Sequence, residues 1–521
     1  MRRRVRISVV RLADLVASVP AAYRDVPVES VGADSRAVRP RALFVARRGR
    51  TVDGHAFVAD AARAGCAAVV GSDLLPAEVT SVLRERGVPY VRVDDPAEAL
   101  GRLAARLRGR PSSTLRIVGV TGTNGKTTVT TLLHELFAFL GHPSGLIGTT
   151  GIRIGADSFP GSHTTPDAVE LQRLLAAMVR SGCRHCFMEV TSHAIDQRRI
   201  AGVDFAGGVF TTLGNDHLDY HGTMEEYARV KHRFLRELPA SAFALSNADD
   251  PRGVSMVAGT RAGLAFYGSG REALLPWAVE SCDEHGMDVR LGAHRVRTSL
   301  IGRQNASNLA AAVTAAVLLG EQLERVLANV PSLRGARGRM ERVVTGPVLG
   351  IVDYAHTPEA LRLALATVRS LRPRGRLLVV GGCGGDRDRQ KRLAMGEAMA
   401  EADLALFTSD NPRSEDVKTI VAAMLAGVPA DRLSCVRVEL DRRRALGLAA
   451  GLARPGDVVL AVGKGHETSQ QIGATREPWD DAVELRAALE NPDTLASIVH
   501  PFASDEGPLA GQRLAAGHTR G

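Results

Sequence analysis

A glycine-rich segment, Thr121–Thr128, has the residue types and spacing of a phosphate-binding loop. It follows the apolar run Ile117–Val120, and apolar side chains recur at helical spacing after it, over residues 129–140. Glycines let backbone N–H groups close around phosphate oxygens, and the following helix presents its positive end to them. Lys126 can then reach the β- and γ-phosphates, and Thr127 can ligate Mg²⁺. The segment therefore predicts an ATP site on a strand, loop and helix.

One position in this segment departs from the general phosphate-loop pattern. The usual spacing places a glycine where this chain has Val120. A glycine turn that precedes a helix by chance is therefore the alternative interpretation. The strand and the helix expected on either side favour the phosphate-binding loop.

Two side chains near the ends of later apolar runs are candidate metal ligands. Glu189 lies in the run Phe187–Val190, where phosphate-loop proteins often place a carboxylate that holds Mg²⁺ directly or through water. We expect His217 at the end of another strand, where it could hold a second metal. Either side chain considered alone is more often a solvated or capping group. We therefore predict a metal site only in combination with the loop.

Polar segments follow four apolar runs in the last third of the chain. They are Asp353–Pro358, Gly381–Asp388, Ser409–Arg413 and Gly463–Glu467. In a parallel sheet such segments converge at the carboxyl edge, where open α/β sheets bind their ligands. Turn chemistry alone also explains Gly, Asp, Asn and Pro after strands, but charge in all four segments favours a binding site. Asp410 could hold an ammonium group there and Arg413 a carboxylate, so that together they would grip a zwitterion.

The elements that would position these residues alternate between strand and helix. Apolar runs at 117–120, at 187–190 and before Phe210 predict strands, and residues 305–319 predict a helix rich in small side chains. The last third of the chain alternates in the same way as far as Val458–Val462. This alternation is typical of a parallel sheet covered by helices, so the sequence predicts an α/β protein.

Length and composition indicate a globular protein of several domains. The chain has 521 residues, which at about 150 residues per domain suggests three domains. With 45% apolar and 24% charged residues, it is unlike a disordered, collagen-like or coiled-coil chain. No run approaches the roughly 18 consecutive apolar residues of a membrane span, and no signal-peptide core follows the basic residues 1–6. We therefore expect a cytoplasmic protein without membrane insertion.

Charge and cysteine content narrow the expected partners. The formal net charge of +9 and a pI near 9.6 raise nucleic acid as a partner. Arginines are spread along the chain without interleaved aromatics, so we expect small phosphorylated or acidic substrates and no nucleic acid. Six cysteines are too few for a disulfide framework. Cys183 and Cys186 have CxxC spacing, and we expect buried thiols there rather than a redox or zinc site.

Ten segments occur in the order seen in the Mur ligases, and the chain resembles that family from about Asp34 to residue 490. The segments are Thr121–Thr128, His163–Asp167, Met188–Arg199, Asp216–Tyr227, Asn305–Ala312, Gly338–Glu341, Asp353–Pro358, Gly381–Asp388, Asp410–Arg413 and Gly463–Glu467. Agreement of ten separate segments in order and rough spacing makes the resemblance specific.

The resemblance implies an ATP-dependent amide ligase of three domains in peptidoglycan precursor synthesis. Residues 1–112 would bind the UDP end of the substrate, and 113–345 would form a central phosphate-loop ATPase domain on a parallel sheet. Residues 346–495 would form a Rossmann-like domain for the incoming amino acid, with a disordered tail at 496–521. In this family ATP phosphorylates the D-glutamate side chain of UDP-MurNAc-L-Ala-D-Glu, and an amine then displaces phosphate. An acyl phosphate has the leaving group that a carboxylate lacks.

The matching motifs carry candidate roles onto this sequence. For ATP they indicate Gly122, Thr123, Asn124, Gly125, Lys126, Thr127, Thr128, Asn308, Arg339 and Asp353. For Mg²⁺ they indicate Thr127, Glu189, His217 and a carbamylated Lys231, and the catalytic candidates are Lys126, Glu189, His217 and Lys231. For the UDP-linked substrate they indicate Ser35, Thr164, Thr165, Thr191, Gln197 and Arg199. For the amino acid they indicate Arg387, Asp410, Asn411, Pro412, Arg413, Gly463 and Glu467.

Two of these assignments depend on charge. From the residues alone we expect Lys231 at the surface, whereas the resemblance implies a carbamate, which can ligate a metal ion that an ammonium would repel. Asp410–Arg413 resembles the diaminopimelate-adding branch of the family rather than the lysine-adding branch. An arginine fits the second amino-acid head of diaminopimelate, and rejection of an analogue that leaves a buried polar group unpaired can reach about 10⁴-fold. The sequence does not distinguish meso from LL diaminopimelate.

Three positions depart from the usual family pattern. His163 replaces a common asparagine, Thr191 a serine, and Ser469 a frequent tyrosine. These changes bear on recognition of the muramoyl peptide, so a related ligase that joins a different acid and amine in specialised metabolism stays open. The sequence shows no groove-reading element of the kind that a nucleic-acid-dependent ATPase would need. Asp410–Arg413 and Gly463–Glu467 argue against a folylpolyglutamate synthetase, which would use the same ATP chemistry on a different carboxylate. We expect a monomer.

Overall fold

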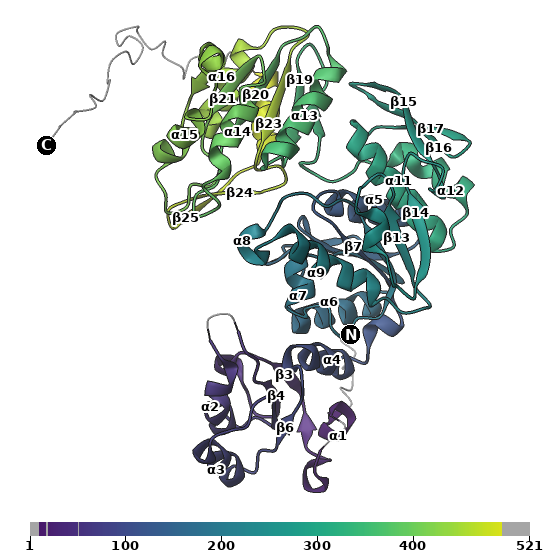
Figure 1. Cartoon of the computed structure of the whole chain (residues 1–521), viewed down its shortest axis with the longest axis vertical. Coiled ribbons are helices and arrows are strands. Elements are labelled where there is room, and N and C mark those ends of the chain that lie inside the picture. Colours follow the sequence, from purple (N-terminus) through teal and green to yellow (C-terminus); the bar gives the residue numbers. More distant parts are fainter. Residues whose placement is uncertain (1–9, 17–18, 50–51, 492–521) are drawn as a thin grey trace, which may run out of the picture. The chain divides into compact units, whose positions relative to one another are not determined.

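The computed structural model describes residues 10–16, 19–49 and 52–491, which form two compact units (Figure 1). The first unit contains the described residues up to Glu341 together with Ala366–Arg372, and the second contains Arg342–Leu365 and the described residues from Pro373 onward. The predicted tail at 496–521 lies outside the described residues. The predicted domain boundaries at 112, 345 and 495 stay predictions.

The N-terminal part of the first unit is built on a four-stranded parallel sheet of order β3-β4-β5-β6. Its strands are β3 Ser30–Gly32, β4 Ala42–Val45, β5 Ala68–Gly71 and β6 Tyr90–Arg92, and its helices are α1 Leu12–Leu15, α2 Val58–Arg63, α3 Ala77–Glu85 and α4 Pro96–Leu107. Alternate strand residues enter two cores, because successive side chains of a strand point to opposite faces. One core includes α1 and α4, and the other includes α2 and α3.

A larger sheet of order β10-β9-β8-β11-β7-β12-β13-β14 forms the rest of the first unit. Its strands are β7 Arg116–Thr121, β8 Ser144–Gly148, β9 Gly151–Ile154, β10 Asp157–Phe159, β11 His185–Glu189, β12 Phe205–Phe210, β13 Phe243–Asn247 and β14 Gly263–Tyr267. The six strands from β8 to β14 in this order are parallel, and β9 and β10 are antiparallel. β7 lies between β11 and β12, so the strands predicted around the glycine loop are neighbours in this sheet.

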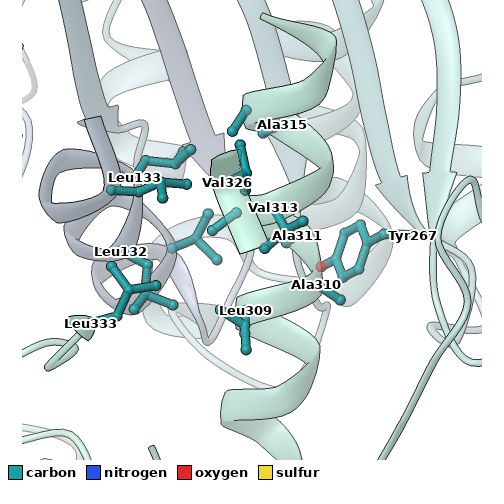
Figure 2. Packing of buried hydrophobic residues seen from close by; sticks show 14 of the residues in the cluster. Leu132, Leu133, Tyr267, Leu309, Ala310, Ala311, Val313, Ala315, Val326 and Leu333 are labelled. Atoms are coloured by element: carbon teal, nitrogen blue, oxygen red, sulfur yellow. The ribbon is translucent and has the colours of Figure 1, made fainter. Parts of the chain in front are cut away.

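Helices cover both faces of this sheet. On one face α5 Lys126–Phe139 packs against α11 Arg303–Leu318, and α12 Leu323–Asn329 completes the core (Figure 2). Small side chains of α11, such as Ala310 and Ala311, permit this close approach. The opposite core draws on α6 Ala168–Arg180 and α9 Met224–Arg236. The helix predicted after the glycine loop is confirmed, and Gly141 follows it with a φ of +82°, as expected for a helix C-terminus.

A small antiparallel sheet and three short helices complete the first unit. The strands β15 Trp277–Asp283, β16 Gly286–Leu291 and β17 His294–Thr298 confirm the β-rich segment that the sequence indicates there. They add Trp277 and Met287 to the core beneath α11. The short helices are α7 Ser192–Asp196, α8 Leu218–His221 and α10 Gly253–Met256.

The second unit is a six-stranded sheet of order β18-β19-β23-β20-β21-β22. Its strands are β18 Glu341–Val344, β19 Leu349–Asp353, β20 Leu377–Gly381, β21 Leu404–Phe407, β22 Val436–Val438 and β23 Val458–Val462. The helices are α13 Pro358–Leu371, α14 Lys391–Met399, α15 Val417–Leu425, α16 Arg442–Leu452 and α17 Asp481–Glu490, and β24 Ser469–Ile472 pairs with β25 Thr475–Pro478. The five strands from β19 to β22 in this order are parallel, which confirms the predicted alternation.

Two further expectations from composition concern thiols and membranes. Cys183 and Cys186 are buried, as predicted. Burial raises the pKa of both thiols above the usual value. Within the described ranges, no helix has the length and apolar content needed to cross a bilayer.

His185 is a buried histidine at the start of β11. Its ring lies 4.5 Å from that of Phe137 between centroids, and its Nδ1 has no hydrogen-bond partner among the residues that the structure describes. Burial lowers the pKa of His185 to about 4. The unfolded chain therefore binds a proton at His185 between about pH 6.5 and 4 that the folded chain does not bind.

We expect the fold to lose stability through His185 as the pH falls across this window. In His185→Phe, the loss of unfolding free energy between pH 7 and 4 should be smaller than in the unsubstituted protein by about 3 kcal/mol. Urea unfolding at a series of pH values measures this difference. The exposed His294 provides a control, His294→Phe, which should keep the original pH dependence. Equal slopes for His185→Phe and the unsubstituted protein would show that His185 titrates normally.

Candidate active site

The glycine loop turns sharply between β7, which ends at Thr121, and α5, which begins at Lys126. Gly122 and Gly125 have φ values of +146° and +90°, which favour glycine. A Cβ at Gly122 would collide with the hydroxyl of Thr211, and one at Gly125 would lie 2.5 Å from Asn308 Oδ1. The loop therefore depends on glycine, and Asn308 of α11 faces it.

Residues after β12 hold the loop in place. The Thr123 N–H donates to the Thr212 carbonyl at 2.6 Å, and the Thr211 hydroxyl donates to the Asn124 carbonyl at 2.5 Å. The Thr123 hydroxyl also lies 3.2 Å from that of Tyr227. Thr127 and Thr128 are buried at the start of α5, and nothing in the described ranges hydrogen-bonds the Thr127 hydroxyl. An oxygen donor is thus available where the loop meets the helix.

Two lysines donate to a single carbonyl of this loop. Lys126 Nζ lies 2.9 Å and Lys231 Nζ 2.8 Å from the oxygen of Gly122. Lys231 is 1% exposed on α9, so the surface position expected from the residues alone is wrong. Its neighbours on α9 include Tyr227, whose ring centroid lies 4.6 Å from Nζ. Burial, together with the charge of Lys126, holds the pKa of Lys231 well below its usual value.

Glu189 ends β11 beside this loop and is 1% exposed. Its two carboxylate oxygens accept from the Thr149 N–H at 2.8 Å and from the Thr149 hydroxyl at 3.1 Å. A Cβ at Gly148 would lie 2.5 Å from Glu189 Oε1, so the glycine makes room for the carboxylate. Burial lowers the pKa of Lys126, and Glu189 opposes that effect. The negative charge of Glu189 therefore stabilises the charged form of Lys126.

The sequence predicted His217 at the end of a strand, and this prediction is wrong. β12 ends at Phe210, and Thr211 and Thr212 already leave the sheet to bind the glycine loop. His217 instead precedes α8 with a φ of +55°, and its Nε2 lies 3.5 Å from the carboxylate of Asp216. Burial lowers the pKa of His217, and Lys126 and Lys231 act in the same direction. The His217 ring is therefore close enough to Lys126 and Lys231 for their charges to act on it.

Sequence reasoning missed the histidines that surround His217. The His193 ring lies 4.8 Å from that of His217 and 5.8 Å from that of His221. Burial, with those two rings, lowers the pKa of His193 to about 4. His221 Nε2 lies 2.9 Å from the Ser192 hydroxyl, which ties α8 to α7. His193 lies in Met188–Arg199 and His221 in Asp216–Tyr227, two of the ten segments that resemble the family. Their place in these segments is the signal by which the sequence could have identified them.

Five of the residues predicted for the UDP-linked substrate lie together next to Glu189. The Thr165 hydroxyl donates to the Glu189 carbonyl at 2.7 Å and lies 3.3 Å from the Thr191 hydroxyl. Arg199 donates to the Thr165 carbonyl at 3.0 Å and to Gln197 Oε1 at 2.8 Å. The fifth, Thr164, lies 3.1 Å from the Thr149 hydroxyl. Thr191 also caps α7, so the departure from serine keeps an N-cap hydroxyl.

Two adjoining pockets continue from this group towards the N-terminal sheet. Ser35, the sixth predicted residue, lines a pocket of about 940 Å³ that extends to α6. Gln197, Arg199 and His163 line a smaller one of about 210 Å³. Both pockets have Arg47 and Asp167 among their lining residues, so they lie side by side.

The four polar segments of the second unit meet at one sheet edge, as predicted. The N–H of Gly463, after β23, donates to the carbonyl of Asp353 at the end of β19. The N–H of Gly385, after β20, donates to the Asn411 carbonyl, and Arg413 Nη1 donates to the Gly385 carbonyl at 2.7 Å. Neighbouring loops are therefore bonded to each other across this edge.

Asp410 and Arg413 offer opposite charges there. Burial raises the pKa of Asp410, while Arg442 and Lys464 act in the other direction. Arg413 has a φ of +52°, and its only hydrogen bond from the guanidinium to a described residue is the one to Gly385. Pro412 beside it is buried, whereas Arg387 is exposed, with its Cγ 3.7 Å from where a Cβ on Gly384 would stand. A carboxylate and a guanidinium with free donors thus flank the edge.

Arg339 and Asp353, predicted for the nucleotide, lie in different units. Arg339 precedes β18 in the first unit, and its charge lowers the pKa of Lys126. Asp353 ends β19 in the second unit, where its Oδ1 accepts from the Ala355 N–H at 2.8 Å. A shared role for both at one nucleotide stays a prediction.

Models of known protein families match this chain in three successive segments. Three family models match: "Mur ligase family, catalytic domain" over residues 27–108, "Mur ligase middle domain" over 120–316, and "Mur ligase, glutamate ligase domain" over 338–465. This chain belongs to the Mur ligase family. The predicted fold class is thereby confirmed, with its central phosphate-loop sheet and the second parallel sheet of the C-terminal unit.

Several Mur ligase relatives are similar along almost their whole length. A Cytophaga hutchinsonii protein named UDP-N-acetylmuramoyl-L-alanyl-D-glutamate--2,6-diaminopimelate ligase is 43% identical over 468 residues, 89% of this chain and 95% of its own. A Geobacillus kaustophilus protein of the same name is 42% identical, over 88% and 94%. A solved structure of a ligase with this name has a TM-score of 0.69 at 33% identity, covering 93% of this chain and 99% of its own. MurF from Thermotoga maritima in complex with ADP, at 20% identity, 91% and 99% coverage and a TM-score of 0.58, shares the fold.

A buried ion pair beneath the second edge was also missed from the sequence. Arg442 and Asp481 are fully buried at the starts of α16 and α17, and Arg442 Nη2 lies 2.6 Å from Asp481 Oδ2. The same guanidinium donates to the carbonyls of Ser409 and Val462, which precede Asp410 and Gly463. Arg442 therefore ties the ends of β21 and β23 together below the polar loops.

Breaking this pair should destabilise the second unit strongly. Asp481→Asn leaves the guanidinium buried without its hydrogen-bonded counter-charge, which should lower the free energy of unfolding by about 3–5 kcal/mol. Replacing both partners, by Arg442→Met with Asp481→Leu, should recover most of that loss. Trp479 donates to Asp481, so its fluorescence in a Trp277→Phe background can follow urea unfolding.

Glu484→Gln is the matched control for this measurement. It breaks the pair between Glu484 and Arg443 on the same two helices, where the Arg443 side chain is 57% exposed. Its effect should stay below about 1 kcal/mol. An Asp481→Asn loss no larger than this would mean that the buried pair is not needed.

Proposed function

We propose that this chain joins diaminopimelate to the D-glutamate side-chain carboxylate of UDP-MurNAc-L-Ala-D-Glu with ATP. The observation that carries the proposal is the sheet edge where Asp410 and Arg413 present opposite charges beside bonded polar loops. An amine nucleophile with a second zwitterionic head complements that arrangement. The relatives at 42–43% identity carry the name of this activity, which supports the same substrates here.

The proposed chemistry passes through an acyl phosphate. The D-glutamate carboxylate oxygen takes the γ-phosphoryl group, and ADP leaves. The amine lone pair then attacks the acyl carbon, and the tetrahedral intermediate expels inorganic phosphate as the amide forms and the amine loses a proton. Lys126 and the N–H groups at the start of α5 are suited to hold the charge on the transferring phosphoryl group.

The donor groups near the loop fit Mg²⁺, which we include in the proposal with ATP. Glu189 accepts only two hydrogen bonds at its carboxylate within the described chain, which leaves lone pairs for a hard cation, and the Thr127 hydroxyl has no competing partner there. His217 is a further candidate ligand, although its ring offers a nitrogen donor where Mg²⁺ prefers oxygen. When bound, Mg²⁺ supplies charge neutralisation on the phosphoryl oxygens.

Lys231 fits such a site as a carbamate rather than as an ammonium. Its lowered pKa favours the neutral amine, the form that can attack CO₂, forming an N–C bond and releasing a proton. The product carries a negative charge beside Lys126, so the repulsion between the two lysines becomes an attraction. Its oxygens are also ligands that Mg²⁺ accepts.

The residues between Glu189 and the two pockets suit the UDP-linked acid. Thr165, Thr191 and Arg199 connect Glu189 to the smaller pocket, so an acceptor carboxylate near Glu189 would leave the nucleotide end towards Ser35. We propose these residues as the substrate path. We further propose that the protein is cytoplasmic, because both substrates are small molecules of the cytoplasm. We also propose that it is a monomer and that it has no nucleic-acid partner.

Substrate dependence of phosphate release tests the proposal. Phosphate should appear only when ATP, UDP-MurNAc-L-Ala-D-Glu and diaminopimelate are all present with Mg²⁺. A panel of amino acids with the same acceptor, and of other acids with diaminopimelate, would reveal the alternative ligase of specialised metabolism. ATP turnover that is indifferent to both substrates would refute the proposal.

Arg413→Ala tests the pocket for the amine. Loss of the guanidinium leaves the second carboxylate of diaminopimelate without its partner, so KM for diaminopimelate should rise about 100-fold or more. The Kd for ATP, measured by calorimetry, should be unchanged, because Arg413 is not among the residues assigned to the nucleotide. Arg437→Ala, at an exposed arginine of β22, is the control. Equal losses of ATP binding and diaminopimelate use would show that the pocket is wrongly assigned.

A further inference from the structure

Lys464 is a fully buried lysine with every donor in use. Its side chain is 0% exposed, in the loop after β23. The ammonium donates to Asn411 Oδ1 at 3.0 Å, to Glu467 Oε2 at 3.0 Å and to the Ser469 carbonyl at 2.9 Å. A lysine ammonium has three donors and no acceptor. Lys464 therefore has no donor left for a ligand and acts only through its neighbours.

The position of Lys464 fixes which way the Asn411 amide points. Asn411 Oδ1 accepts from Lys464 and from the Gln471 N–H at 2.9 Å, and both of these groups only donate. Asn411 Nδ2 donates to Glu467 Oε2 at 2.7 Å. Turning the amide over would set its NH₂ against two donors and its oxygen against a carboxylate. The orientation is thus determined by the network.

This orientation leaves one donor and one acceptor at the sheet edge. An amide NH₂ has two N–H groups, and within the described chain only Glu467 receives one from Asn411. Glu467 uses Oε2 for both Lys464 and Asn411, and no described residue donates to its Oε1. The Glu467 side chain is 30% exposed, so Oε1 can meet a ligand. An N–H beside a carboxylate oxygen complements the carboxylate and ammonium of one amino-acid head.

We propose that Lys464 is a positioning residue that sets the preference for diaminopimelate over lysine by locking the Asn411 amide with its N–H towards the ligand. This inference rests on the proposed function, because it concerns the amine that the ligase uses. Lysine has a lone ammonium where diaminopimelate has a second head, so lysine gains nothing from the Asn411 N–H. A turned amide would present an oxygen, which repels a carboxylate and accepts from an ammonium.

The test is Lys464→Met, which keeps the length and apolar stem of the side chain and removes all three donors. KM for diaminopimelate should rise about tenfold to 100-fold, as expected for the loss of a hydrogen bond to a charged group. KM for ATP and for UDP-MurNAc-L-Ala-D-Glu should stay within about twofold. The ratio of kcat/KM for diaminopimelate to that for lysine should fall, because lysine use is unchanged or improved. Lys418→Met, at the exposed lysine of α15, is the matched control.

Asn411→Leu makes the test independent of whether Lys464→Met folds. It removes the amide, so it should lower the same ratio by itself. Adding Lys464→Met to Asn411→Leu should lower the ratio no further, because the amide through which Lys464 acts is absent. Equal losses for diaminopimelate and lysine in Lys464→Met, or an unchanged ratio in either single variant, would overturn the inference. If the unsubstituted protein uses no diaminopimelate, the proposed function itself fails.

Discussion

Parallel strand direction is the constraint on which both candidate sites depend. In each unit the chain returns through helices, so every strand of the parallel set ends at the same edge, and the residues after those ends are brought together. In the first unit this places the glycine loop after β7 beside Glu189 of β11 and Thr211 after β12. In the second it places Asp353, Asn411 and Gly463 within hydrogen-bonding reach of one another's loops.

Basic side chains then fix the geometry that strand direction only approximates. Lys231 and Lys126 both bind the Gly122 carbonyl, Arg442 ties Ser409 to Val462, and Lys464 orients Asn411. Each is held by carbonyls or carboxylates, because an unpaired charge in the interior is costly. This cost favours a single position of each loop, because a loop that moved away would leave a charge without its partner. The same property suits Arg442 and Lys464 to positioning roles rather than to ligand binding.

The two sites differ in how they treat charge. Around the glycine loop two lysines meet, so the arrangement favours a neutral or modified Lys231 and attracts phosphate. At the second edge positive and negative groups are interleaved: Lys464 accompanies Glu467, Arg442 accompanies Asp481, and Asp410 and Arg413 stand apart with opposite signs. The first arrangement suits an anion such as a nucleotide and the second a zwitterion. An amide ligase that activates an acid with ATP and receives an amino acid needs both.

The sequence by itself determined the elements and the motif residues. Apolar periodicity located β7, α5, β11 and the alternating strands of the second unit, and the glycines at 122 and 125 are required by their positive φ values. Spacing along the chain could not determine the burial of Lys231, the displacement of His217 from its strand, or the pairing of Arg442 with Asp481. These depend on contacts between segments far apart in sequence, and a lone lysine, histidine or arginine has the same local pattern at the surface as in the interior. Only the tertiary structure decided which polar side chains lie in the interior and therefore must find a partner there.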